Sequence, residues 1–205
     1  MTHVLYVLGN FPTLSETFII NELNEIERNN LQISIVSTAR KSEIPPVMHA
    51  FAQALQQRTN YMPASSAEMG RIIASQLFRH PGRSLEMWRR NNALPVLNGH
   101  NKFKRWLKCL VVAGFAEKFK ATHLHGHWTT PSDVAAIVAK TLGLTYSFTL
   151  HAHDIYDEDT VLQKKGGGAA LRSDGATFVA TCTRYNYQHL LERYGTQFKA
   201  PLYPI

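Results

Sequence analysis

The sequence predicts an α/β fold in which a parallel sheet is flanked by helices and carries a helical insertion. Three observations support this prediction. Short apolar strands alternate with amphipathic helices at both ends of the chain, the first strand meets the first helix through a short loop, and the region between the two ends lacks clear strands. The 205 residues suit one domain with a sizeable core and fall short of two full α/β domains.

An apolar run from His3 to Leu8 predicts a buried first strand, because it is β-branched and aromatic and ends in turn residues. A helix is expected next, starting at a capping box formed by Thr13 and Glu16 and running to about Asn29. Apolar side chains share the inner side of this helix: Phe18, Ile19, Leu23 and Ile26. Polar side chains are expected to face mostly outward: Asn21, Glu22, Glu25 and Arg28. A second strand is predicted from Leu31 to Ser37.

Residues from about 43 to 120 are expected to form the helical insertion, because prolines break several helical stretches and no strand pattern appears. Its last helix, around Phe103 to Phe119, is amphipathic. Basic residues gather near its start: Lys102, Lys104, Arg105 and Lys108. We expect a core-facing helix with a solvated charged side, and contact with an anionic membrane is the alternative.

The α/β alternation resumes at a strand from His123 through Trp128. The following helix is predicted to have Thr130 as its cap, Pro131 at its first position and Gly143 just past its end. Further elements are expected at the end of the chain: strands at Tyr146–Leu150 and Ala176–Thr181, a flexible connection at Gly166–Gly168, and a helix at Arg184–Arg193. The sheet should therefore have five or more strands.

Composition limits the cellular setting and the partners. The formal charge of +7 favours polyanionic partners, but no basic tract with interleaved stacking aromatics appears, so nucleic acid is not expected. The chain does not open on a secretory signal pattern, and no apolar window approaches the roughly 20 residues that cross a bilayer. We expect a cytoplasmic protein in which Cys109 and Cys182 are reduced, buried core residues.

Three polar segments follow predicted strands, which is where open parallel sheets bind ligands. They are Asn10–Glu16, His125–Thr130 and His151–Asp154. The carboxyl ends of parallel strands meet at one edge of a sheet, so these segments are expected to open onto a common cleft.

These segments resemble those of family 4 glycosyltransferases, especially bacterial exopolysaccharide enzymes of the colanic acid type. Residues Phe11–Ile19, FPTLSETFI, resemble the F-P-x-L-S-E-T-F-I stretch of that family. His125-Gly126-His127-Trp128 is similar to the H-x-H-[FW] segment, and Phe148–Ile155 is similar to F-T-x-H-A-x-D-I. Residues Thr181–Asn186 resemble T-C-[ST]-x-x-N. Order and spacing agree from Met1 to about Tyr194.

The resemblance implies that residues 1–205 form the Rossmann-like, amino-terminal, acceptor-side half of a GT-B fold. The carboxyl-terminal donor domain, with its E-x7-E region, has no counterpart in the sequence. The full enzyme would be a retaining hexosyltransferase in exopolysaccharide or lipopolysaccharide biosynthesis, and this chain alone would be inactive. Its partners would be a nucleotide sugar, a lipid-linked or saccharide acceptor and an anionic inner-membrane surface, and it would need no metal or other cofactor.

His151 matches the family histidine that touches the transferred sugar, so the resemblance makes it the catalytic residue. Eight residues would bind substrate: Phe11, Pro12, Thr13, Ser15, Glu16, His127, Trp128 and Asp154. Asp154 either orients His151, binds an acceptor hydroxyl or caps the next helix, and Glu16 also has a structural interpretation through the capping box. We expect the chain to turn after Ala152, so that His153 contributes less than His151.

Two other functions remain compatible with the residues. A metal-dependent hydrolase is one, because three histidines alternate on one strand and three further candidate ligands follow the next strand: His123, His125, His127, His151, His153 and Asp154. A stand-alone carbohydrate-binding module is the other.

Overall fold

The computed structural model describes residues 2–13, 15–43, 50–95, 101–157 and 172–205. The strands are β1 (His3–Leu8), β2 (Gln32–Arg40), β3 (Thr59–Met62), β4 (His123–His127), β5 (Thr145–Leu150), β6 (Phe178–Thr181) and β7 (Leu202–Pro204). The α-helices are α1 (Thr17–Arg28), α2 (Ala50–Arg58), α3 (Ser66–Arg79), α4 (Pro81–Ala93), α5 (Lys102–Lys118), α6 (Thr129–Leu142) and α9 (Arg184–Tyr194). The predicted connection at Gly166–Gly168 lies outside the described residues.

The strands form one seven-stranded sheet in the order β3-β2-β1-β4-β5-β6-β7, and every pair is parallel. The predicted α/β fold with a parallel sheet is therefore confirmed. The chain adds β2 and β3 on one side of β1 and then returns to add β4 on the other. A doubly wound sheet binds ligands at such a reversal, so the carboxyl ends of β1 and β4 mark the expected cleft.

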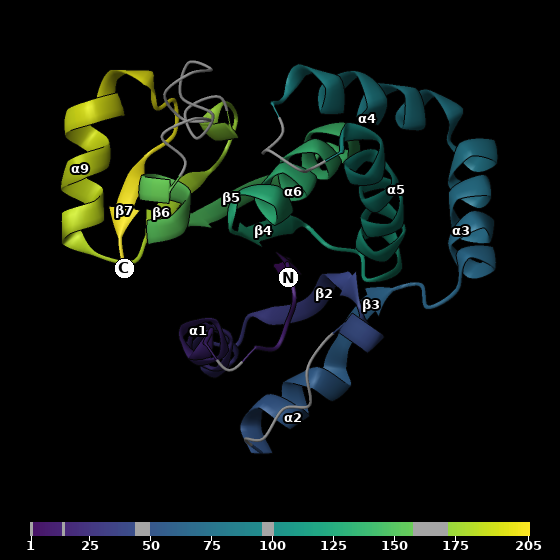
Figure 1. Ribbon diagram of the computed structural model, residues 1–205, viewed down its shortest axis with the longest axis horizontal. Coiled ribbons are helices and arrows are strands. Elements are labelled where there is room, and N and C mark those ends of the chain that lie inside the picture. The colour runs from purple at the N-terminus through teal and green to yellow at the C-terminus, as the bar shows by residue number, and fades with distance from the viewer. Residues whose placement is uncertain (1, 14, 44–49, 96–100, 158–171) are drawn as a thin grey trace.

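Helices cover both faces of the sheet (Figure 1). On one face, α5 and α6 pack over the strands, and buried Leu5 and Val7 of β1 belong to that core. On the other face, α1 and α2 cover the β1–β2 region, where Tyr6 of β1 joins the second core. Tyr6 is aligned with His125 of β4, which is aligned with Ser147 of β5, so a row of polar side chains continues along the face that carries α1.

The prediction that no strand lies between residues 43 and 120 is wrong at Thr59–Met62. This segment is β3, which pairs only with β2 at the edge of the sheet. Its four residues are too few to show an alternation, and the polar Asn60 suits an edge position. The second strand also runs further than predicted, to Arg40.

Both predicted helix caps are wrong. Helix α1 begins at Thr17 with Glu16 before it, and no side chain caps its first amides. Helix α6 begins at Thr129, so Thr130 lies inside it. The predicted end of α6 is confirmed, since Gly143 adopts a left-handed conformation with φ of 70° just past Leu142.

Helix α5 packs against the core, as expected from its apolar face. Arg105, however, is not one of its solvated basic residues. Only 4% of Arg105 is exposed, and its guanidinium pairs with Asp133 of α6. Arg172 pairs with the same carboxylate from a third segment of the chain. None of the helices that the structure describes is long and apolar enough to cross a membrane.

Candidate functional site

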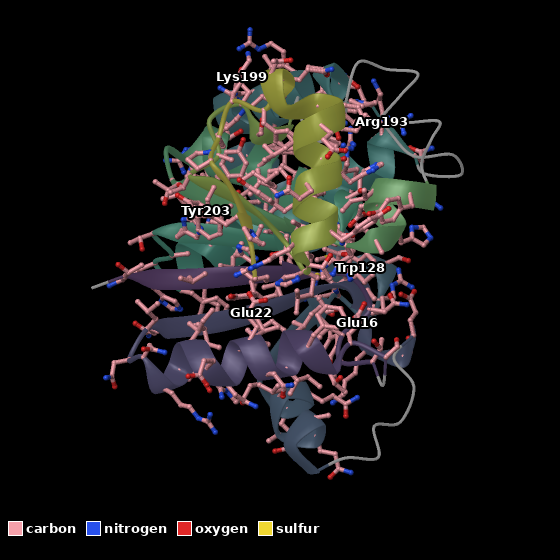
Figure 2. The ribbon with its side chains drawn as sticks, turned by 90° about the vertical axis from the view of Figure 1, so that its left-hand side faces the viewer. Glu16, Glu22, Trp128, Arg193, Lys199 and Tyr203 are labelled. Atoms are coloured by element: carbon pink, nitrogen blue, oxygen red, sulfur yellow. The ribbon has the colours of Figure 1, made fainter. Side chains whose placement is uncertain are left out.

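The three predicted segments meet at the carboxyl edge of the sheet, as expected. A pocket of about 340 Å³ there, which we call the edge pocket, is lined by residues from each of them. Its walls include Asn10 and Glu16 after β1, Trp128 and Thr129 after β4, and Asp154 after β5. Figure 2 shows Glu16 and Trp128 near one another at this end of the molecule.

A second pocket of about 530 Å³, the face pocket, lies over the sheet beside α1. It is lined by side chains from α1 and from the first, fourth, fifth and sixth strands, among them Tyr6, Phe18, Glu22, His125, His151 and Cys182. His151 follows β5 directly and lines the face pocket, and the Trp128 ring beside it lines the edge pocket.

Both ring nitrogens of His151 have partners within the chain. Nε2 lies 3.1 Å from Nδ1 of His127, and Nδ1 lies 3.1 Å from the Sγ atom of Cys182. The Trp128 ring packs on the same imidazole, with 4.1 Å between ring centroids. Burial, together with the neighbouring His127, lowers the pKa of His151 to about 3, so the imidazole is neutral near neutral pH.

Asp154 fixes the backbone around His151. Its Oδ2 accepts a hydrogen bond from the His151 backbone N–H at 2.9 Å, and its Oδ1 accepts from the N–H and hydroxyl of Thr129 at 2.9 and 2.6 Å. A carboxylate at the first residue of α6 also suits the positive end of the helix dipole. Asp154 therefore orients His151 through its backbone and caps the first residue of α6.

The expected turn after Ala152 is present. A π-helical turn begins at His153, and the Ile155 N–H donates to the His151 carbonyl. His153 is exposed and lines the edge pocket, whereas His151 is buried. The two histidines thus occupy different surroundings.

Trp128 reaches its position through an unusual backbone. Its φ angle is 67°, a left-handed conformation that is uncommon for a bulky residue and that is typically maintained by surrounding structure at functional sites. The turn is possible because Gly126 lets α6 pass close to β4: a Cβ atom there would lie 2.6 Å from the Cα atom of Ser132. The serine holds the turn, since its hydroxyl donates to the Trp128 carbonyl at 2.5 Å.

The Glu16 carboxylate faces Trp128 instead of closing a capping box. Burial raises the pKa of this carboxyl above its usual value, although contacts with Thr13, Trp128 and His127 oppose the rise. Glu16 is half-buried and lines the edge pocket, so it is placed to accept a hydrogen bond from a ligand hydroxyl.

The remaining predicted site residues lie at different depths. Phe11 is fully buried in the core beneath α1, and Pro12 is also buried. Thr13 is half-buried and Ser15 is exposed. Phe11 and Pro12 line neither the edge pocket nor the face pocket.

Sequence analysis missed Glu22, which was expected to face outward. It turns toward the sheet, where it accepts a hydrogen bond from the Tyr6 hydroxyl at 2.8 Å and lies 3.4 Å from Nε2 of His127. Burial alone would raise the pKa of Glu22, but His127, His125 and Tyr6 together bring it down to about 2. The helical period itself gave a signal, because position 22 lies one turn from both Phe18 and Ile26.

Cys182 was also misassigned. Cys109 is a buried free thiol, as predicted, but Cys182 is only half-buried and contributes its sulfur to the face pocket. Its place directly after β6 was the available signal, since residues at that end of a parallel strand face the cleft.

No family model and no curated protein matches the chain. Several solved structures are similar to it in fold. They include a sucrose-phosphate synthase from Thermosynechococcus elongatus, with a TM-score of 0.59 and 8% identity, covering 99% of this chain and 47% of that one. A glycosyltransferase from Rickettsia africae gives a TM-score of 0.54 and 14% identity, covering 95% of this chain and 40% of that one. Phytolacca americana UGT2 gives a TM-score of 0.51 and 10% identity, covering 100% of this chain and 52% of that one.

The chain spans about half the length of these proteins. It has the Rossmann-like fold of one half of a GT-B glycosyltransferase, which confirms the predicted fold class. At such low identities the similarity establishes the fold alone. Any proposal about function therefore depends on the arrangement of residues in the two pockets.

Acid should destabilise the chain through its buried histidines. Burial, with His127 nearby, lowers the pKa of both His125 and His151 from 6.5 to about 3. Between these pH values the unfolded chain binds protons that the folded chain does not, so the free energy of unfolding should fall as pH falls from about 6.5 toward 3. Urea unfolding at a series of pH values measures this. A His125→Gln variant should show a shallower slope, and an equal slope would contradict the assignment.

Proposed function

We propose that this chain is the amino-terminal, acceptor-side domain of a retaining, nucleotide-sugar-dependent glycosyltransferase of the family 4 type. The acceptor would be a saccharide, free or lipid-linked, of a bacterial exopolysaccharide or lipopolysaccharide. The donor's own phosphate would help to deprotonate the acceptor hydroxyl, so transfer itself would need no metal. Most of the donor would be held by a second domain facing the cleft, and this domain alone would not complete transfer.

The observation that carries the proposal is the arrangement of Trp128 between the two pockets. Its half-buried ring offers an apolar surface, and the polar groups of Glu16 and Asn10 lie in the same edge pocket. An apolar wall with a few placed hydrogen-bonding groups is the composition of a small-molecule site. Its position, at the reversal of a doubly wound sheet, is where such sheets bind ligands.

His151 is proposed to contact the transferred sugar through Nδ1. The present partner of that nitrogen is the thiol of Cys182, which forms only weak hydrogen bonds, so a sugar hydroxyl in the face pocket can replace it. The other nitrogen stays bonded to His127, which holds the ring in place. A neutral imidazole can then hydrogen-bond a sugar hydroxyl and counter charge that builds up near the reaction centre.

Ligand titrations of this chain test the proposal. Gluco- and galacto-oligosaccharides should change the tryptophan fluorescence, because Trp128 lines the edge pocket. The change should disappear in Trp128→Phe and persist in the matched control Trp88→Phe, since Trp88 lies on α4. Calorimetry with UDP-glucose and GDP-mannose should show no tight binding. Micromolar binding of either nucleotide sugar to this chain would contradict the proposal that a second domain holds the donor.

We also propose peripheral contact with the anionic inner membrane through the start of α5. Phe103 is 52% exposed there, and Lys102 and Lys104 flank it, while Trp88 and Trp106 pack beside it. An exposed aromatic between basic residues combines apolar insertion with attraction to acidic headgroups. Arg105, which is buried, takes no part in this surface.

Flotation with acidic liposomes measures this contact. Binding at low salt is expected to fall on reversing Lys102 and Lys104 to glutamate, because each basic residue near an anionic surface contributes about 1 kcal/mol. Reversal of Lys118 and Lys120, at the far end of α5, changes the net charge equally and should have little effect. Equal losses from both pairs would indicate a general charge effect, and unaltered binding would disprove the electrostatic contact.

A further inference from the structure

Three side chains with metal-ligating atoms converge in the wall of the face pocket. The Oε1 atom of Glu22 lies 3.4 Å from Nε2 of His127 and 3.8 Å from Nε2 of His125, and the three atoms all lie within 4.8 Å of one another. Glu22 comes from α1, while the histidines come from the same face of β4. Figure 2 shows Glu22 between α1 and the strands.

The Nε2 atom of His127 is the second observation that points to a ligand. His127 is completely buried, and within the described part of the chain this nitrogen has no hydrogen-bond partner. The Glu22 carboxylate is near it but does not form a hydrogen bond of regular geometry with it. A buried polar atom without a partner is costly, and a bound ion is one of the few arrangements that would satisfy it.

The surroundings of each group are those of a metal ligand. Nδ1 of His125 pairs with the Ser147 hydroxyl at 2.7 Å, and Nδ1 of His127 pairs with His151 at 3.1 Å. Metal-bound histidines are held in this way by the ring nitrogen that does not face the ion. Nε2 of His125, which would face the ion, lies 3.2 Å from the Thr149 hydroxyl, so this hydroxyl would turn away when the ion binds. The Glu22 carboxylate is held by the Tyr6 hydroxyl and has further lone pairs to offer.

We propose that Glu22, His125 and His127 bind one divalent transition-metal ion, with zinc as the preferred metal. Two imidazoles and a carboxylate suit zinc, whereas magnesium and calcium prefer oxygen ligands throughout. Zinc ligands about 2.1 Å from the ion lie roughly 3.4 Å apart in a tetrahedron, so small shifts would close the site. Three protein ligands leave one position open, as in other zinc sites that bind exogenous ligands.

The ion would join α1 to β4 next to His151, whose Nε2 is bonded to His127. The inference does not rest on the proposed function, because a transferase whose chemistry needs no metal can still bind an ion at this place. Nor does it need a sugar for its test. Failure of metal binding and failure of saccharide binding are therefore separate results.

Zinc titration of the untagged, chelator-treated chain in competition with a chromophoric chelator tests the site. One equivalent should bind and raise the melting temperature, because a ligand of the folded state stabilises it. Glu22→Gln and His127→Gln should each weaken binding by about a hundredfold or more, since even outer-shell changes at metal sites cost about ten- to a hundredfold. Two matched controls outside the site, His80→Gln and His189→Gln, should leave the affinity unchanged. Magnesium should not compete.

Three outcomes would overturn the proposal: no zinc binding, zinc binding that both site variants retain, or equal loss in the controls. Because His127 is fully buried, the metal-free melt of each variant is measured to detect a loss of the fold. Glu22→Gln then decides alone, since glutamine keeps the shape of the side chain and can still accept from Tyr6 while removing the carboxylate charge.

Discussion

Replacing His151 by alanine should lower sugar transfer about a hundred- to a thousandfold in an enzyme that joins this domain to a donor domain. One well-placed polar contact to a reacting centre is typically worth about 2.7–4 kcal/mol in the transition state, which corresponds to that loss. The His151 backbone should stay in place, because Asp154 holds its N–H and not its ring. The measurement is kcat together with a thermal melt of each variant.

His153→Ala is the matched control for this experiment. His153 is two residues away, but the intervening turn leaves it exposed in the edge pocket. Its loss should reduce transfer much less. Equal losses with unchanged melting temperatures would mean that the two histidines act together. Near-normal turnover of His151→Ala would end the assignment of His151 as the residue that contacts the transferred sugar.

The elements that sequence analysis placed well are those whose pattern is set locally. His3–Leu8 was predicted to the residue as β1, because a short apolar run with β-branched and aromatic residues, followed directly by turn residues, favours a strand over a helix. Gly143 fixed the end of α6, since glycine adopts the left-handed conformation without strain. The convergence of polar segments at one edge followed from the geometry of a parallel sheet.

The errors concern residues whose partners are distant in the sequence. Thr13 and Glu16 formed a plausible local cap, but the Glu16 carboxylate faces Trp128, more than a hundred residues away. Glu22 has the polarity of an outward residue, yet Tyr6 and two histidines of β4 draw it inward. Polarity alone cannot distinguish a solvated side chain from one whose partner arrives from another strand.

Arg105 is the clearest case of this kind, and it leads to the second large expected effect. Arg105 was grouped with its sequence neighbours Lys102, Lys104 and Lys108 as a solvated basic residue. It is instead buried against Asp133. Arg172 approaches the same carboxylate from the segment before β6. One buried carboxylate thus joins α5, α6 and that segment.

Asp133→Ala should destabilise the chain by about 3–5 kcal/mol, because it leaves the buried Arg105 and Arg172 without their shared counter-ion. The total stability of a domain is about 5–15 kcal/mol, so this loss is a large fraction of the whole. Arg105 keeps hydrogen bonds to the Asn91 and Leu94 carbonyls, but these dipoles do not neutralise its charge. Urea unfolding of both proteins measures the difference.

Glu86→Ala is the control, since it also removes a carboxylate that pairs with two arginines. Glu86 contacts Arg89 and Arg90 on the surface of α4, where water screens the charges. Such exposed pairs contribute little to stability, so the effect of removing Glu86 should be small. A loss in Asp133→Ala no larger than that of the control would show that water or a rearranged partner compensates the two arginines. A loss several times larger would establish that this carboxylate holds α5 and α6 together behind the candidate site.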